Sequence, residues 1–459
     1  MKQEHDFTRG KITLPLLRFV LPVFFAMLLQ AMYGAVDLLI VGHFAQSLDV
    51  SAVSTGSQMM MTVTGLITSF AMGTTILLGQ RIGEGRGREG GEVVGSSLCL
   101  FGAIALGFTL LLPLLAGPLS RVMNAPQEAF DATKAYIRIC GFGSLFIVAF
   151  NLLGSIFRGI GDSKTPMYTV LVACVCNIAG DLLLVGVFGL GTAGAAIATV
   201  AAQGVSVAIS LLVLRKKPLP FVFHRSDIRF AGAIVRRVTA LGLPIALQDL
   251  LVGISFLVLL AIVNNLGLTP SAGVGVAERV CGFIMLIPSA FMQAMAAFVA
   301  QNIGAGRYDR AKRTLGSAIA VSMLPAVAMF VLTFWHSDLL SAVFSNDTAV
   351  IAASAQYLKA YAIDCLLTCF LFCFIGFFNG AGKTTFVMAQ GMIGAFLVRV
   401  PVAFLMSREQ PISMFHIGLA TPCSTVIQVL LCLACFWFTT RSWEHSESTG
   451  GVSAKQLSF

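Results

Sequence analysis

The chain alternates long apolar stretches with short polar gaps from residue 14 to residue 438. An α-helix needs about 20 mainly apolar residues to cross a bilayer, so each long apolar stretch predicts one membrane-spanning helix. Twelve such spans are predicted, at residues 14–41, 51–78, 93–115, 136–156, 166–188, 192–214, 238–263, 271–298, 315–334, 357–378, 386–407 and 417–438. Because these spans leave no room for a large soluble domain, we expect an all-α polytopic membrane protein with twelve transmembrane helices.

The composition supports a membrane protein. Hydrophobic residues make up 57% of the chain and charged residues only 11%, whereas soluble domains contain about 25% charged residues. The formal charge is +9, but the lysines and arginines lie in the gaps between apolar stretches, as topology signals do, so no nucleic-acid partner is expected. The first span is too long for a signal-peptide core and is followed by further spans, so we expect a retained helix.

The basic residues also predict an orientation. Most of the 30 lysines and arginines lie at the two termini or in alternate loops, namely Lys2, Arg9, Lys11, Arg18, Arg81, Arg86, Arg88, Arg158, Lys164, Arg215, Lys216, Lys217, Arg225, Arg229, Arg236, Arg237, Arg307, Arg310, Lys312, Arg313, Lys383, Arg441 and Lys455. The opposite loops hold only Arg121, Lys134, Arg138, Lys359 and Arg408. Since positively charged loops remain in the cytoplasm, a multi-pass protein of the inner cell membrane with both termini cytoplasmic is predicted.

The second half of the chain repeats the first. A shift of 221 residues aligns Gln80, Gly83 and Arg86 with Gln301, Gly304 and Arg307, and it also aligns Gly159 with Gly380. Two six-helix lobes are therefore expected, and because six is even they are related by a pseudo-two-fold axis along the membrane normal, with a cleft between them as the substrate route. The predicted parts are a lobe at 1–214, a cytoplasmic linker at 215–237, a lobe at 238–440 and a cytoplasmic tail at 441–459. The mixed basic and apolar linker either lies on the anionic inner membrane surface or is simply solvated.

Sequence features that would indicate an enzyme or a cofactor site are weak. The 11 cysteines all lie in apolar stretches, where a thiol behaves as a small hydrophobe, so packing is favoured over metal binding. Residues 380–384 resemble the end of a phosphate-binding loop, but Phe377 stands where the first glycine should be and a membrane span precedes it, so a turn matching residues 159–164 is favoured. No HExxH motif occurs and the six histidines do not cluster, so no enzymatic activity and no bound cofactor are expected.

Ionisable side chains within predicted spans are costly and point to function. Five acids qualify, namely Asp37, Asp181, Asp249, Glu278 and Asp364. The sequence leaves open whether the last three bind partners on other helices, face a wet cleft or contact substrate.

Asp37 and Asp181 differ because other polar residues lie one helical turn away. Tyr33 precedes Asp37, and Asn177 precedes Asp181, at a spacing that puts each pair on one helix face. At ~1.5 Å per residue, both carboxylates and Thr199 lie roughly 6 to 12 Å inside the outer ends of their spans. Such oxygen groups suit a hard cation such as Na⁺, while two carboxylates taken out of water could instead take up a proton. Both ions remain open at this point.

The second half contains no copy of this cluster. At the same shift, Tyr33, Asp37, Asn177 and Asp181 align with Ile254, Val258, Val398 and Val402. A coupling site built on these residues would belong to the first half alone.

These residues resemble the multidrug and toxic compound extrusion (MATE) family along essentially the whole chain. The resemblance rests on Pro22 and Asp37 in the first span, the turn at 80–86, the stretch RGIGDSKTP at 158–166, NIAGD at 177–181 and GAAIATVAAQ at 194–203. In the DinF-like prokaryotic branch, it implies a cation or proton site at Asp37, Asn177, Asp181 and Thr199, with Tyr33 and Asn151 as supporting groups. Pro22 is then a hinge of the first span. The roles of carboxylates in the NorM-like branch do not transfer to Asp249 or Asp364.

The resemblance implies a secondary antiporter that exports amphipathic, often cationic organic compounds in exchange for H⁺ or Na⁺ by alternating access. Only if sodium is the coupling ion would Asp37, Asn177, Asp181 and Thr199 form a metal site. The expected partners are small organic molecules and the lipid bilayer, and the expected functional unit is a monomer. A related flippase for lipid-linked saccharides is the alternative, although it would need basic groups for a diphosphate.

Overall fold

The computed structural model describes residues 6–448, which contain helices and turns but no strand. Eleven helices in this range are long and apolar enough to cross a membrane, and a bent helix pair raises the number to twelve. The predicted all-α polytopic fold is confirmed. Residues 449–459 of the predicted tail lie outside the described range.

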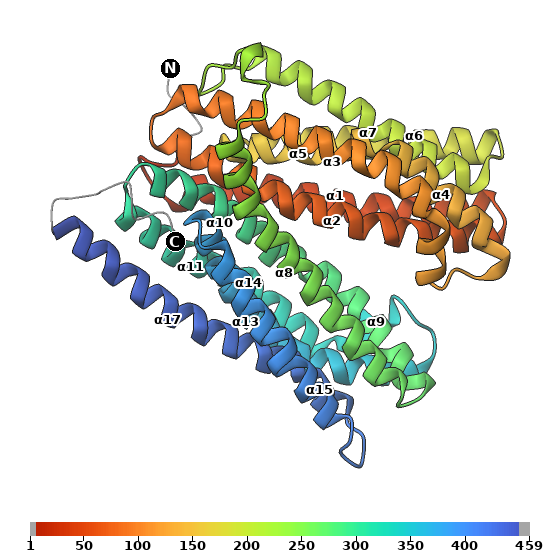
Figure 1. The fold of residues 1–459 in the computed structure, drawn as a ribbon. Helices are drawn as coiled ribbons and strands as arrows, with labels where there is room; N and C mark the ends of the chain where they lie inside the picture. The colour runs from red at the N-terminus through yellow and green to blue at the C-terminus, as the bar shows by residue number, and fades with distance from the viewer. Residues whose placement is uncertain (1–5, 449–459) are drawn as a thin grey trace. The chain divides into compact units, whose positions relative to one another are not determined.

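The first half of the chain forms most of the helices that position the candidate site (Figure 1). They are α1 Thr13–Phe44, α2 Ser47–Gly83, α3 Gly87–Val122, η1 Gln127–Ala129, α4 Phe130–Phe142, α5 Ser144–Gly159, α6 Lys164–Asp181, η2 Leu182–Val187 and α7 Gly191–Lys216. The short η3 Arg225–Asp227 lies in the predicted linker.

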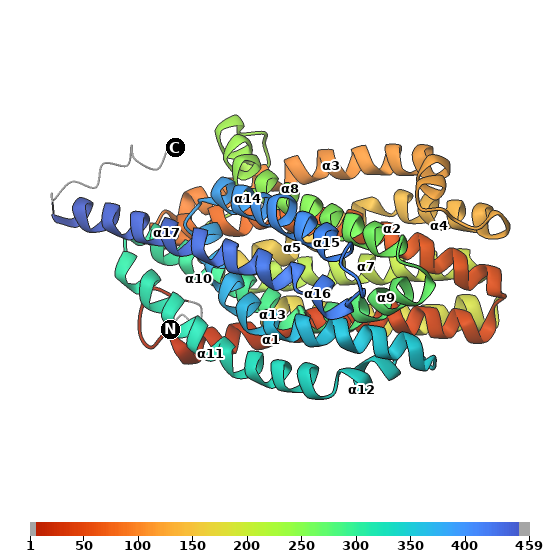
Figure 2. The ribbon, with the colours of Figure 1, turned by 90° about the horizontal axis from the view of Figure 1, so that it is seen from below.

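The second half runs through a similar series of spans (Figure 2). They are α8 Gly232–Asn264, α9 Leu268–Ile284, α10 Leu286–Gly304, α11 Tyr308–Trp335, α12 Ser337–Ala342, α13 Thr348–Gly380, α14 Thr384–Met392, η4 Ile393–Arg399, α15 Val400–Met406, α16 Met414–Gly418 and α17 Ala420–Ser448. η2 and η4 are π-helical segments, and each interrupts one of the predicted spans.

One predicted span is sharply bent. The prediction placed a single helix at 136–156, whereas α4 and α5 meet at Gly143 with a bend of 56°. Glycine is a poor helix former, and here it also lacks the side chain that Val200 of α7 would otherwise meet.

The chain divides into two compact units. Unit 1 comprises Met1–Leu250, Met285–Arg307 and Gly376–Val387, and unit 2 comprises Leu251–Ile284, Tyr308–Ile375 and Met388–Phe459. In unit 1, α2 packs against α5 and α10, while α6 lies between α1 and α7. In unit 2, α17 and α15 pack against η4. The lobe boundaries inferred from the sequence follow the internal repeat and stay a prediction.

The repeat extends to the backbone of two turns. Gly85 and Gly306 adopt φ values of 71° and 67°, and Gly161 and Gly382 adopt 86° and 80°. Both pairs are related by the 221-residue shift. Positive φ is open to glycine at little cost, so the two halves contain the same turns for the same steric reason.

Candidate ion-coupling site

Three neighbouring helices of unit 1 supply the predicted site residues. Asp37 lies on α1, Asn177 and Asp181 lie at the end of α6, and Thr199 lies on α7. Asp37, Asn177 and Asp181 are 4%, 1% and 0% exposed. The helical spacing that suggested the cluster therefore places its charged members inside the unit.

Asn177 connects the cluster. Its Nδ2 lies 3.4 Å from Asp37 Oδ1 and 3.4 Å from Thr199 Oγ1. The Thr199 hydroxyl donates to the Ala195 carbonyl at 3.0 Å. Both contacts of Asn177 are longer than usual for a hydrogen bond, so the amide holds the two neighbouring helices loosely.

Several buried oxygens of the cluster have no hydrogen-bond partner. They are Asn177 Oδ1 and both carboxylate oxygens of Asp181. The Asp181 and Asp37 carboxyl groups are nevertheless close enough to interact directly. Leaving a buried acceptor unpaired costs about 1 to 3 kcal/mol. A proton shared between the two carboxyl groups would supply the missing donor.

The same oxygens fit a sodium ion. The two carboxylates, the free carbonyl oxygen of Asn177 and the Thr199 hydroxyl are hard donors of the kind that alkali and alkaline-earth cations prefer. In the described part of the chain, no group of three or more His, Cys, Asp or Glu side chains could hold a metal ion, so a sodium site here would need the neutral oxygens in addition to the two carboxylates. The residues present thus suit either ion.

Tyr33 also belongs to this region, together with two residues that the sequence did not single out. Tyr33 interacts with Asp37 and with Gln203 of α7. Tyr136 of α4 is 2% exposed and its phenol interacts with Thr199 and Asp37. Gln203 lies one turn after Thr199, a spacing that could have identified it from the sequence.

Asn151, predicted as a supporting group of the site, forms hydrogen bonds with Thr68 and Ile147. Its Oδ1 accepts from Thr68 Oγ1 of α2 at 2.6 Å, and its Nδ2 donates to the Ile147 carbonyl at 2.8 Å. Both ends of the amide therefore have partners outside the carboxylate cluster. Pro22 is buried in α1, where it cannot donate a hydrogen bond to the Arg18 carbonyl.

An irregular backbone follows the second carboxylate. Asp181 ends α6, and η2 continues the span as a π-helix. Such segments widen the helical turn and are often found at functional sites. This feature could not be read from the apolar pattern of the span.

The three remaining intramembrane acids have the following partners. Asp249 accepts a hydrogen bond from Ser69 of α2 within unit 1. In unit 2, Thr368 Oγ1 donates to Asp364 Oδ2 at 2.7 Å, and Arg399 interacts electrostatically with Asp364. Glu278 Oε1 has no hydrogen-bond partner.

Comparison with known proteins assigns the family. A family model described as MatE matches the chain twice, over residues 22–183 and over residues 244–405. The chain belongs to the MATE family. The two matches also agree with the internal repeat, because each half of this MATE chain matches the same model.

Curated MATE relatives match over nearly their whole length. The chain is 26% identical over 404 residues to the probable multidrug resistance protein YpnP of Bacillus subtilis (strain 168), covering 88% of this chain and 90% of that protein. It is 24% identical over 415 residues to the multidrug export protein MepA of Staphylococcus aureus (strain N315), with coverage of 88% and 90%.

Solved MATE structures share the fold. An outward-facing multidrug resistance MATE transporter of the MOP superfamily superposes with a TM-score of 0.90 at 18% identity, over 97% of this chain and 99% of that chain. A crystal structure of a MATE protein in complex with MaL6 gives a TM-score of 0.89 at 19% identity, over 97% and 100%. This likeness shows that the chain has the fold of these MATE structures.

Proposed function

We propose that the chain exports amphipathic, often cationic organic compounds in exchange for H⁺ or Na⁺ by alternating access. The buried pair of Asp37 and Asp181, with acceptor oxygens that lack donors, is the observation that supports this most strongly. The substrate class is supported by the names of the two relatives above, which refer to multidrug resistance and multidrug export. These names favour drug export over flipping of lipid-linked saccharides.

The coupling mechanism follows from the cluster. An ion arriving from outside would neutralise part of the Asp37 and Asp181 charge and provide the partner that the Asp181 oxygens lack. Asn177 would then rearrange its long contacts to Asp37 and Thr199, and α1 would bend at Pro22 and expel the substrate. A membrane potential supplies about 2.3 kcal/mol per charge per 100 mV, enough for tens-fold accumulation.

The proposal includes a cellular setting. The distribution of basic residues supports a cell-membrane protein with both termini in the cytoplasm. Since the candidate coupling residues all lie in one compact unit of one chain, we propose that a monomer suffices for transport.

The test is transport in reconstituted vesicles with imposed sodium or pH gradients, with efflux of a cationic dye as the readout. We expect Asp37→Asn and Asp181→Asn to abolish gradient-driven efflux, because neither variant can bind the coupling ion between two carboxyl groups. Asp338→Asn, which changes an exposed aspartate of α12, is the matched control and should transport normally.

The two gradients separate the coupling ions. Efflux driven by a sodium gradient at constant pH would identify Na⁺, and efflux driven only by a pH gradient would identify H⁺. Full gradient-driven efflux in both aspartate variants, at equal protein level, would refute the coupling site.

A further inference from the structure

A reciprocal pair of hydrogen bonds within unit 1 links the two halves of the chain. Gln80 of α2 donates from Nε2 to the Gly380 carbonyl at 3.2 Å, and Gln301 of α10 donates from Nε2 to the Gly159 carbonyl at 3.2 Å. The 221-residue shift converts Gln80 into Gln301 and Gly159 into Gly380. Gln80 in the first half therefore binds Gly380 in the second half. Its counterpart in the second half, Gln301, binds Gly159 in the first half, and Gly159 is the counterpart of Gly380.

The helices that carry the glutamines touch through their backbones. A Cβ atom on Gly83 would lie 2.0 Å from the Gln301 carbonyl oxygen, and one on Gly304 would lie 2.0 Å from the Gln80 carbonyl oxygen. Gly83 and Gly304 are again related by the repeat. A side chain at either position would collide with the facing backbone, so glycine permits the close approach of α2 and α10 here.

The reciprocal bonds are buried and cap helix ends. Gln80 is 9% exposed and Gln301 is 1% exposed. Gly159 and Gly380 are the last residues of α5 and α13, where carbonyl groups have no partner within the helix. Breaking either bond leaves a buried donor and a buried acceptor unpaired unless water enters. The contact is therefore either closed and dry or open and hydrated.

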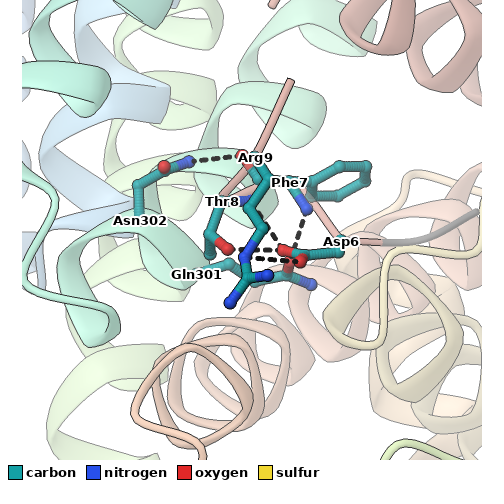
Figure 3. Close-up of polar contacts among 6 residues, drawn as sticks. All are labelled: Asp6, Phe7, Thr8, Arg9, Gln301 and Asn302. Carbon is teal, nitrogen blue, oxygen red and sulfur yellow. Dashed lines mark hydrogen bonds and ion pairs between the residues drawn. The ribbon is translucent and has the colours of Figure 1, made fainter. Parts of the chain in front are cut away.

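The amino-terminal segment fastens one of the two glutamines (Figure 3). The Phe7 N–H donates to Gln301 Oε1 at 3.4 Å, and Asn302 Nδ2 donates to the Phe7 carbonyl at 3.3 Å. The Phe7 ring stacks on Phe298 of α10 with 3.7 Å between centroids. Gln301 thus uses its carbonyl oxygen for the amino-terminal segment and its amide nitrogen for Gly159.

We propose that Gln80 and Gln301 form the cytoplasmic gate of the transport cycle and that the segment 6–9 strengthens the closed gate through Gln301. This proposal rests on the alternating-access function and on the orientation proposed above. When the cytoplasmic side opens to admit substrate, both glutamine bonds break and the Gly83 and Gly304 contacts separate. When the gate closes, the same four groups pair again and expel water.

Hydrogen–deuterium exchange of the purified full-length protein tests the gate. Gln80→Met and Gln301→Met keep the side-chain volume but remove the donor. Each variant should raise backbone exchange about two- to tenfold in both segments, 76–86 and 297–307, because one broken bond favours opening of the whole contact. Gln428→Met removes a buried glutamine of α17 whose amide donates to Ser424 of the same helix, and it should leave both segments unchanged.

The reciprocal effect distinguishes a gate from local support. Exchange that rises only in the segment carrying the substitution, or in neither segment, would overturn the proposal. If a methionine variant does not fold, Gln80→Asn and Gln301→Asn, which are too short to reach the glycine carbonyls, provide the same comparison. Phe7→Ala should raise exchange at 297–307 by a smaller factor than Gln301→Met, and no change would remove the segment 6–9 from the proposal.

Transport separates this proposal from the function on which it rests. The glutamine variants should change the maximal rate of dye efflux at least twofold, because they alter how readily the cytoplasmic side opens and closes. If the Asp37→Asn and Asp181→Asn variants transport normally but the reciprocal exchange effect is found, the proposed coupling site is refuted and the proposed gate is supported. If those variants lose transport and the glutamine variants show no exchange effect, the gate alone fails.

Discussion

At the scale of single residues, Asp162 shows how a buried charge can stabilise a turn. It is 1% exposed, accepts hydrogen bonds from the backbone N–H groups of Lys164 and Thr165, both at 3.1 Å, and lies 2.7 Å from Lys217 Nζ. Burial opposes ionisation, but the bonds from Lys217 and Thr165 outweigh it and hold the pKa of Asp162 below its ordinary value. The ionised carboxylate therefore fastens the start of α6 to the end of α7.

The first prediction concerns this ion pair. Asp162→Asn should destabilise the protein by about 1.5 to 3 kcal/mol at pH 7, because it removes a charge-assisted bond from a buried site. Since the folded-state pKa is lowered, this stability is fully present above the ordinary value of 3.8 and disappears as the pH falls through the folded-state pKa. Thermal melting at several pH values measures the difference, with Lys216→Gln as the control. A difference that persists at the lowest pH would contradict this account.

The second prediction contrasts two asparagines. Asn177→Ala should raise the half-maximal concentration of the coupling ion about two- to tenfold, because it removes one neutral partner of Asp37. Asn151→Ala should leave that concentration unchanged, because its partners are Thr68 and Ile147. Ion-dependent dye efflux measures both. Equal shifts in the two variants would show that Asn151 also contributes to ion binding.

At the scale of helices, breaks and π-helical segments decide where side chains point. α4 and α5 bend at Gly143, and η2 begins directly after Asp181. A regular α-helix in place of η2 would rotate the side chains beyond it by a different amount, because a π-turn contains more residues than an α-turn. The composition of these spans predicts that they cross the membrane but not where they are irregular.

The third prediction tests the bend at Gly143. A Cβ atom at this position would lie 2.4 Å from both methyl carbons of Val200, so Gly143→Ala should destabilise the protein by about 1 to 3 kcal/mol through overpacking. Val200→Ala in the same chain should restore part of the loss, because it removes those methyl groups. Melting temperatures of the two single variants and the double variant give the coupling. Additive effects would show that the contact is not the cause.

At the scale of the whole molecule, duplication explains which features occur twice and which occur once. The family model matches both halves, and the turns at Gly161 and Gly382 share one backbone conformation. The carboxylate cluster lies only in the first half, where valines occupy three of the equivalent positions in the second half. The repeat thus preserves helix contacts, whereas the proposed ion coupling would involve one half alone.

The fourth prediction concerns topology. Tags placed at either end of the chain should be reached by an added protease only after the cells are permeabilised, because the proposed orientation places both ends in the cytoplasm. A tag inserted after Glu128, in the loop between α3 and α4, should be cleaved in intact cells. Cleavage of one end tag alone before permeabilisation would show an odd number of crossings, and cleavage of both would show the inverse orientation. Either result would refute the proposed orientation.

The sequence by itself determined the helical class, the number of spans to within the bent pair, the duplication and the family. These properties depend on the length of apolar stretches and on residue identity at fixed spacings. Each of these can be read from its own stretch of sequence without knowing how the helices pack. The one-turn spacing from Tyr33 to Asp37 and from Asn177 to Asp181 also predicted which side chains share a helix face.

Only the tertiary structure decided how those faces meet. It brought Asn177 within 3.4 Å of both Asp37 and Thr199, used Asn151 for another contact, and added Gln203 and Tyr136. It also revealed the reciprocal bonds of Gln80 and Gln301, which join residues 300 and 142 positions apart in sequence. The physical reason is that hydrogen bonding and close packing between helices depend on their rotation and crossing, and hydrophobic periodicity in a span surrounded by lipid leaves both undetermined.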